Sequence, residues 1–161
     1  MTLDLGAFLD GYCAGRTITV PVGPVDEERA RLLRVTEQTL AMSIQEMRPG
    51  RNWSDIAKLI QKNVESNGFN VVREFVGRGV GKSWIDEPKV PNFYGSDTVR
   101  SDFKLRPGMT FTVEPIVLSG GREIELLQDG FTVVTRDRKP AAHVRHTVAV
   151  TGNGVDVLTK L

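Results

Sequence analysis

The segment FVGRGVGKSW, residues 75–84, contains three glycines and ends its glycine run with Gly-Lys-Ser, as phosphate-binding loops do. Such a loop needs a further glycine five residues before Gly-Lys-Ser, because successive backbone amides must wrap the phosphates. The residue five places before Gly81 is Val76. Pro88 also prevents the helix that should follow such a loop. We therefore reject nucleotide binding here, and we expect Lys82 to lie on the surface.

The composition excludes several classes of protein. The chain has 161 residues with 21 basic and 20 acidic side chains, so it lacks the basic excess typical of nucleic-acid binding. No apolar run approaches the ~20 residues that span a bilayer. The single cysteine, Cys13, excludes an internal disulfide and a cysteine-cluster zinc site. We expect one cytoplasmic domain that binds neither nucleic acid nor a membrane.

Local patterns predict where the helices and first strands lie. Strands are expected over residues 2–9 and 16–22, around an Asp10-Gly11 turn. A helix beginning near Asp26 should end at Pro49-Gly50, with a buried stripe. The expected stripe comprises Ala30, Leu33, Leu40, Ile44 and Met47. A second helix should follow Asn52 or Ser54, bury Ile56, Leu59, Ile60 and Val64, and end at Gly68.

The rest of the chain favours short strands. FNVVREF, residues 69–75, is strand-like, whereas residues 77–108 are rich in Gly and Pro and are expected to be mostly loop. Short β-rich segments follow from residue 109 to the end. The pattern predicts an α+β fold in which helices pack on one face of a largely antiparallel sheet.

Several segments together resemble the methionine aminopeptidases of the creatinase/aminopeptidase superfamily. They are LDLGAFLDGY, VVREFVGRGVG, DEPKVPNFYG, LRPGMTFTVEP, DGFTVVTRD and HVRHTVAVTGNGVDVLT, and they cover nearly the whole chain in family order. The resemblance implies a pita-bread fold, a curved and mostly antiparallel sheet with two main helices on one face. It also implies that residues 1–161 form a single truncated pita-bread domain lacking the N-terminal half.

The same resemblance implies a degenerate metal site. The family binds two metal ions through two aspartates, a histidine and two glutamates. Asp4 and Glu114 match the first aspartate and the first glutamate. The other three ligand positions are lost, at Gly15, Arg78 and Arg145. Arginine stays protonated and offers only donors, so we expect no metal ion and no other cofactor.

Charge balance suggests what replaces the metal ions. Two arginines against two carboxylates give a neutral site, and buried carboxylates without a counter-charge are costly. The planar guanidinium matches a carboxylate in bidentate fashion. We therefore predict that Arg78 and Arg145 occupy the metal volume and pair with Asp4 and Glu114. The alternative is that the two arginines form an anion clamp for a substrate.

Further residues are candidates for the pocket and for chemistry. By resemblance, Ile85 replaces a pocket histidine. Trp84 and Phe93 are expected to line the pocket or to fill it. His146 and Cys13 could form a nucleophile pair, but a lone cysteine is usually inert packing and His146 is also consistent with a sheet histidine. Asp4 and Glu114 are the remaining candidates for proton transfer.

Three functions follow from these alternatives. The first is a pseudoenzyme, a pita-bread scaffold that binds a protein or peptide without peptidase activity. The second is a metal-independent enzyme acting on a small acidic substrate held by Arg78 and Arg145. The third is an active metalloaminopeptidase. Because open sheet edges and apolar patches find partners, we also predict a homodimer, or a partner chain in place of the missing half.

Overall fold

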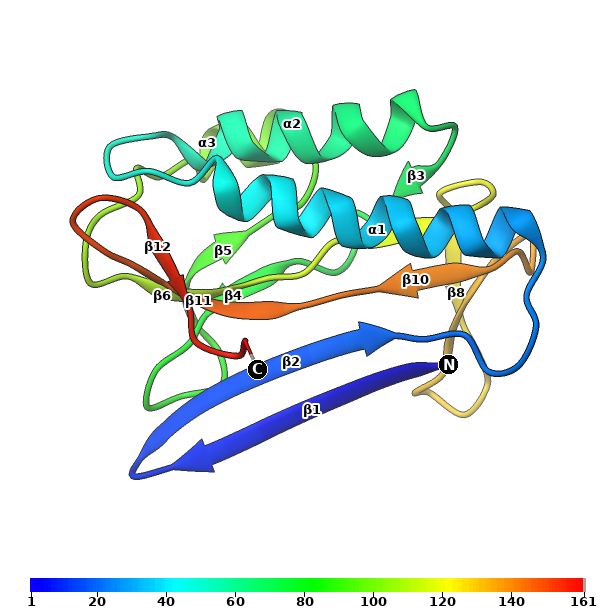
Figure 1. Cartoon of the computed structure of the whole chain (residues 1–161), viewed down its shortest axis with the longest axis horizontal. Coiled ribbons are helices and arrows are strands. Elements are labelled where there is room, and N and C mark those ends of the chain that lie inside the picture. Colours follow the sequence, from blue (N-terminus) through cyan, green and yellow to red (C-terminus); the bar gives the residue numbers. More distant parts are fainter. Residues whose placement is uncertain (161) are drawn as a thin grey trace.

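Two long helices cover one face of a layer of antiparallel strands (Figure 1). The computed structural model describes residues 1–160, apart from the side chain of residue 97. The helices are α1 (Glu27–Gln45), α2 (Trp53–Ser66) and the short α3 (Ser96–Arg100). The strands are β1 (Thr2–Leu9), β2 (Tyr12–Thr19), β3 (Asn70–Val71), β4 (Gly77–Gly79), β5 (Asp86–Val90), β6 (Thr110–Val113), β7 (Ile116–Leu118), β8 (Ile124–Leu126), β9 (Val133–Thr135), β10 (Ala141–His143), β11 (His146–Val150) and β12 (Val155–Val157).

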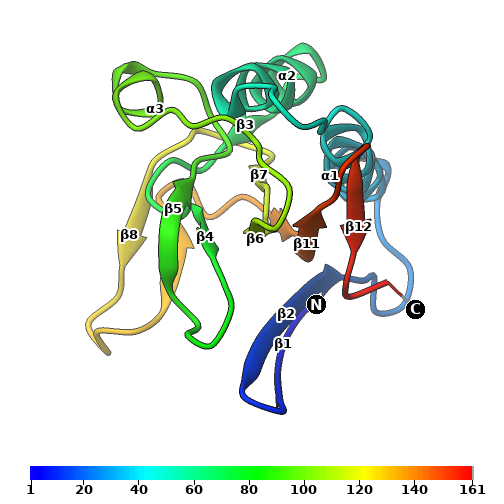
Figure 2. The same ribbon diagram turned by 90° about the vertical axis from the view of Figure 1, so that its left-hand side faces the viewer.

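The strands form four antiparallel groups in the described part of the chain. The largest has the order β12-β11-β6-β4-β5, and a second has the order β10-β7-β3. The hairpins β1-β2 and β8-β9 complete the set. Viewed from the end, β1-β2 and β4-β5 lie on opposite sides below the helices (Figure 2). The α+β class and the placement of helices on one face are confirmed.

Asp26 caps the start of helix α1. The Asp26 carboxylate accepts a hydrogen bond from the Arg29 backbone N–H at 2.8 Å, which satisfies one free donor of the first turn. Of the predicted stripe, Leu40 and Met47 are buried, but hydroxyl residues fill much of the buried face. Thr36 and Thr39 are tolerated there because each hydroxyl donates to the carbonyl one turn earlier, at 2.7 and 2.6 Å.

Helix α2 packs its apolar face into the main core. Trp53 at its start is buried, stacks on Phe103 with centroids 6.0 Å apart, and donates from its indole N–H to the Pro91 carbonyl at 2.8 Å. Gly68 ends the helix as predicted, with φ of 76° that favours glycine. Within residues 1–160, neither long helix is apolar enough over its length to cross a membrane.

Two expectations about strands are corrected. The second strand is β2 and starts at Tyr12 rather than residue 16, because Asp10 and Gly11 alone make the turn, with φ of 50° and 85°. The predicted strand at residues 69–75 is reduced to β3. Residues 77–108 are mostly loop, as expected, and they also contain β4, β5 and α3.

The glycines of the 75–84 segment serve strand packing. A Cβ on Gly77 would collide with the Thr112 carbonyl, and one on Gly79 would collide with the Glu87 carbonyl. These glycines let β4 pair closely with β5 and β6 on its two sides. Backbone contact between strands therefore explains the motif that resembled a phosphate loop.

The β1-β2 hairpin is fixed to β11 by backbone and side-chain hydrogen bonds. Thr17 and Arg145 form an antiparallel bridge, with N–H to carbonyl distances of 3.2 and 2.9 Å. The Thr147 hydroxyl contacts both the N–H and the carbonyl of Gly15 at 2.9 Å. The register pairs Asp4 with Thr17, and alternation places Asp4 and Gly15 on the same face of the hairpin.

Candidate functional site

Arg145, in the C-terminal part of the sequence, contacts Asp4 in the first strand. Its guanidinium forms an ion pair with the Asp4 carboxylate, and its Nη1 is 3.9 Å from Oε2 of Glu114. The Arg145 and Glu114 side chains are 18% and 13% exposed, whereas Asp4 is 55% exposed. The predicted contact of Arg145 with both carboxylates is therefore present in the structure, and much of it is shielded from solvent.

Gly15 provides the volume that the guanidinium occupies. A Cβ built on Gly15 would lie 2.8 Å from Nη2 of Arg145 and 3.1 Å from its Cζ. Carbon and nitrogen do not approach that closely without displacement, so any side chain at this position would compete with Arg145 for the same space. Gly15 has no side chain, and the Arg145 guanidinium fills the space that a side chain there would need.

The carboxylates at this site have different environments. The Thr17 hydroxyl donates to Oδ1 of Asp4 at 2.8 Å, the oxygen that also faces Arg145. Burial raises the pKa of the Glu114 carboxyl, and Asp4 adds to that effect, while Thr112, Arg145 and Arg78 oppose it. The site thus holds one solvated carboxylate and one largely buried carboxyl around a single close guanidinium.

His143 belongs to the same cluster, and the sequence reasoning missed it. Burial lowers its pKa to about 4, with repulsion from Arg145 as the second cause, so the ring is neutral near pH 7. Its Nε2 is buried without a hydrogen-bond partner, as is Nε of Arg145. Its position two residues before Arg145 could have identified it, because such residues share a face in an extended segment.

Arg78 does not pair as predicted. It forms no ion pair within 4.0 Å among the described residues. Its charge acts on Glu114 only at longer range, where it lowers the pKa of that carboxyl. The expectation that both arginines bind the surviving carboxylates is therefore wrong for Arg78. Arg78 lies on β4, and its side chain lines both the cavity of about 160 Å³ that contains Arg145 and Glu114 and a neighbouring hollow beside Lys89.

Trp84 and Phe93, predicted to share a pocket, are separated. Trp84 and Ile85 line the cavity that contains Arg145, and the Trp84 ring lies against Gly6 of β1. Phe93 instead lines a neighbouring hollow and packs against the core around α1. Arg78 lines both spaces.

The structure does not bring His146 and Cys13 together. Nδ1 of His146 is 2.9 Å from the Thr159 hydroxyl, and this histidine lines a different hollow, next to α1. Sγ of Cys13 is buried near the Lys82 carbonyl, at 3.9 Å. The two side chains contact different parts of the structure, so they do not form the predicted nucleophile pair. Lys82 is exposed, as expected.

The residues at the site do not fit a pair of metal ions. Within the described part of the chain, no group of three or more His, Cys, Asp and Glu side chains could hold a metal ion. Divalent ions need several oxygen or imidazole donors in a fixed geometry. Asp4 and Glu114 supply carboxylates, but Arg145 contributes a positive charge at the place where both converge.

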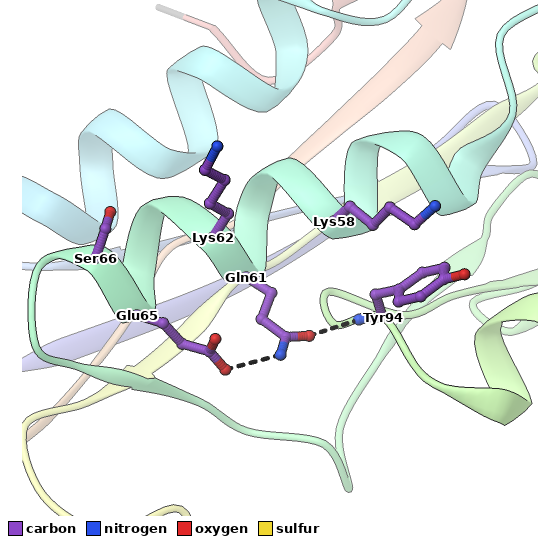
Figure 3. A pocket seen from close by; sticks show the side chains of 6 residues that line it. All are labelled: Lys58, Gln61, Lys62, Glu65, Ser66 and Tyr94. Atoms are coloured by element: carbon purple, nitrogen blue, oxygen red, sulfur yellow. Dashed lines mark hydrogen bonds between the residues drawn. The ribbon is translucent and has the colours of Figure 1, made fainter.

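A separate hollow of about 470 Å³ lies on the outer side of α2 (Figure 3). Several of its polar groups are engaged with one another. Gln61 donates to Glu65 at 2.7 Å and accepts from the Tyr94 backbone N–H at 2.8 Å. The Lys58 ammonium lies 4.2 Å from the centre of the Tyr94 ring. Helix α2 lies across the strand layer from β1 (Figure 1), and we assign no site to this hollow.

Comparisons with known proteins agree with this architecture. The structure matches methionine aminopeptidase from Thermotoga maritima with a TM-score of 0.94 and 39% identity, over 99% of this chain and 63% of that one. The prolidase from Pyrococcus furiosus matches with a TM-score of 0.75 at 20% identity, over 99% of this chain and 41% of that one, which supports the fold alone. The fold is the pita-bread fold.

The sequence comparisons define the family. The profile of metallopeptidase family M24 matches residues 1–152. Methionine aminopeptidase 1 of Bacillus subtilis is 42% identical over 161 residues, covering all of this chain and 64% of that protein. The Escherichia coli methionine aminopeptidase is 38% identical over 159 residues, covering 99% of this chain and 59% of that protein. The chain belongs to metallopeptidase family M24, and it spans about three fifths of the length of these relatives.

Proposed function

We propose that this chain is a methionine-aminopeptidase-like binding protein that does not hydrolyse peptides by metal-dependent catalysis. The observation that carries the proposal is the Arg145 guanidinium, paired with Asp4 in the volume that a side chain at Gly15 would need. A cytoplasmic location stays a prediction.

Electrostatics supports this proposal. A two-metal hydrolase uses its ions to generate a nucleophilic water and to stabilise the developing charge on the substrate. A guanidinium is a fixed cation with no lone pair to donate, so it repels a metal ion and cannot help to bind one. With Arg145 beside both surviving carboxylates, the remaining donors are too few for the established chemistry of a metal pair.

The names of the relatives favour the competing proposal, an active aminopeptidase. That proposal requires metal ligands elsewhere in the chain, because Gly15, Arg78 and Arg145 cannot bind a metal ion through their side chains. The proposal of a metal-independent enzyme with Arg78 and Arg145 as a clamp has limited support. Both arginines line the 160 Å³ cavity, but the charge of Arg145 is already engaged by Asp4. Binding without peptidase chemistry accounts best for these contacts.

We further propose that the protein partner is a second copy of this chain, paired through β1. In the described residues β1 pairs with β2 alone, so its other edge has free backbone donors and acceptors. Leu5 and Leu9 on its outward face are 67% and 74% exposed. Antiparallel pairing of β1 with the same strand of a second copy is isologous and closes into a dimer.

Turnover of a methionyl peptide with added Co²⁺ or Mn²⁺ tests the main proposal. We expect no hydrolysis above the rate of metal alone for the natural chain. Hydrolysis that disappears in both the Asp4→Asn and the Glu114→Gln variants would contradict the proposal, since it would show catalysis that depends on these carboxylates.

A further inference from the structure

A basic hollow lies beside β4 and β5, next to the cavity of Arg145. It has a volume of about 230 Å³ and is lined by Arg73, Arg78 and Lys89. None of these cations forms an ion pair within 4.0 Å in the part of the chain that the structure describes. Among the described lining residues, Glu74 alone carries a carboxylate, so the hollow holds a clear excess of positive charge.

The strand register forces two of these cations together. Arg78 of β4 and Lys89 of β5 are directly opposite in the antiparallel pair, so both side chains project from the same face. Like charges in such a pair destabilise a sheet. An anion held between them would remove that repulsion and use the donors that both side chains present.

The third cation is held in place by packing. The Arg73 guanidinium lies 5.3 Å from the centre of the Phe93 ring, an attractive arrangement for a cation on an aromatic face. The Phe93 carbonyl accepts a hydrogen bond from the buried Thr98 hydroxyl at 2.7 Å, which fixes this segment. Arg73 is therefore oriented before any ligand arrives, which reduces the entropy cost of binding.

We propose that this hollow binds a doubly charged oxyanion, a phosphate or dicarboxylate group of a small molecule. Among the described lining residues, three cations against the Glu74 carboxylate leave two positive charges uncompensated, which matches a dianion. A phosphate monoester carries about −1.5 to −2 charge at pH 7, and the planar fork of arginine suits phosphate and carboxylate oxygens equally. The site goes beyond the function proposed above, because it uses neither Asp4 nor Arg145.

Calorimetric titration with inorganic phosphate, and separately with succinate, at constant ionic strength tests the site. We expect saturable binding of at least one anion with a stoichiometry near one per chain. Removing one charge-assisted contact should weaken it ~10-fold in Lys89→Gln and in Arg73→Gln. Lys62→Gln, a lysine of α2 that does not line this hollow, is the matched control and should bind as the natural chain does.

The two anions distinguish the ligand class. Binding of phosphate without succinate assigns a phosphate ligand, and the reverse assigns a dicarboxylate. Absence of saturable binding for both anions, or binding that is unchanged in Lys89→Gln and Arg73→Gln, would overturn the proposal. Either result leaves the metal question untouched, because peptide hydrolysis is measured with variants of Asp4 and Glu114.

Discussion

Gly15 and Arg145 occupy one shared volume: a single added carbon on Gly15 would lie 2.8 Å from the Arg145 guanidinium. The two residues are 130 positions apart in the sequence, yet the bridge between Thr17 and Arg145 holds their strands side by side. The absence of a side chain at Gly15 therefore makes room for the large cation of Arg145. In the function proposed above, this pair leaves no space for a metal ion beside Asp4.

The shared volume predicts strong coupling between the two positions. Gly15→Ala should lower the free energy of unfolding by ~1–2 kcal/mol, because the guanidinium must leave Asp4. In an Arg145→Leu background the same change should cost little or even stabilise the strand, since glycine is entropically costly. Urea unfolding of both single variants and the double variant measures the coupling. Equal effects of Gly15→Ala in both backgrounds would contradict the account.

The unequal pairing of the two arginines predicts unequal stability effects. Arg145→Met removes the close partner of Asp4 and the cation 3.9 Å from the largely buried Glu114 carboxyl, and it should cost ~2–4 kcal/mol. Arg78→Met removes a cation that makes no ion pair in the described structure and should cost less than ~1 kcal/mol. Chemical denaturation compares the two matched variants. A larger loss for Arg78→Met would show that the assignment of pairing is wrong.

His143 predicts a loss of stability in mild acid. Its pKa is about 4 in the folded chain against 6.5 ordinarily. Between these values the unfolded chain binds the proton more readily, so stability falls as pH drops from about 6.5 to 4. From pH 7 to 5 the loss should be ~2 kcal/mol. The raised pKa of Glu114 acts in the opposite direction.

Comparison with His143→Gln isolates the histidine from the neighbouring groups. Arg145 and Asp4 are the charged groups that act on this ring, and both remain in the variant. Urea unfolding at pH 7 and pH 5 should show the natural chain losing ~2 kcal/mol more than His143→Gln. If both proteins respond alike to pH, the histidine is not kept neutral by its surroundings.

The open edge of β1 predicts a concentration-dependent dimer. A lysine in place of an exposed outward leucine is a common protection of an edge strand, so Leu5→Lys should shift the chain toward monomer. Leu126→Lys, at a residue of β8 that is 60% exposed, is the matched control. Light scattering at micromolar concentration measures the mass. A natural chain that is monomeric there would refute the dimer.

Elements set by local chemistry were predictable from the sequence. The Asp10-Gly11 turn, the Asp26 cap and the Gly68 terminus each depend on a few neighbouring residues. The short strands β4 and β5, which pair with each other, were missed because their segments are rich in Gly and Pro, and because β4 is also paired with the distant β6.

The candidate site was predictable only in part. Resemblance identified Asp4, Glu114 and Arg145 as neighbours, and the structure places them together. It did not predict that Arg78 would line a second hollow as well, because the direction and reach of a long side chain depend on the packing around its strand. His143 was missed because its only signal in the sequence is its spacing of two residues from Arg145, which shows that the two share a face but not that the ring is buried.

Metal titration of the natural chain tests the central claim most directly. Calorimetry with Mn²⁺ or Co²⁺, alongside the Asp4→Asn and Glu114→Gln variants, measures whether the surviving carboxylates hold an ion. We predict no saturable metal binding that depends on these carboxylates, because the Arg145 guanidinium already occupies the position between them. Stoichiometric binding that is lost in both variants would contradict the account.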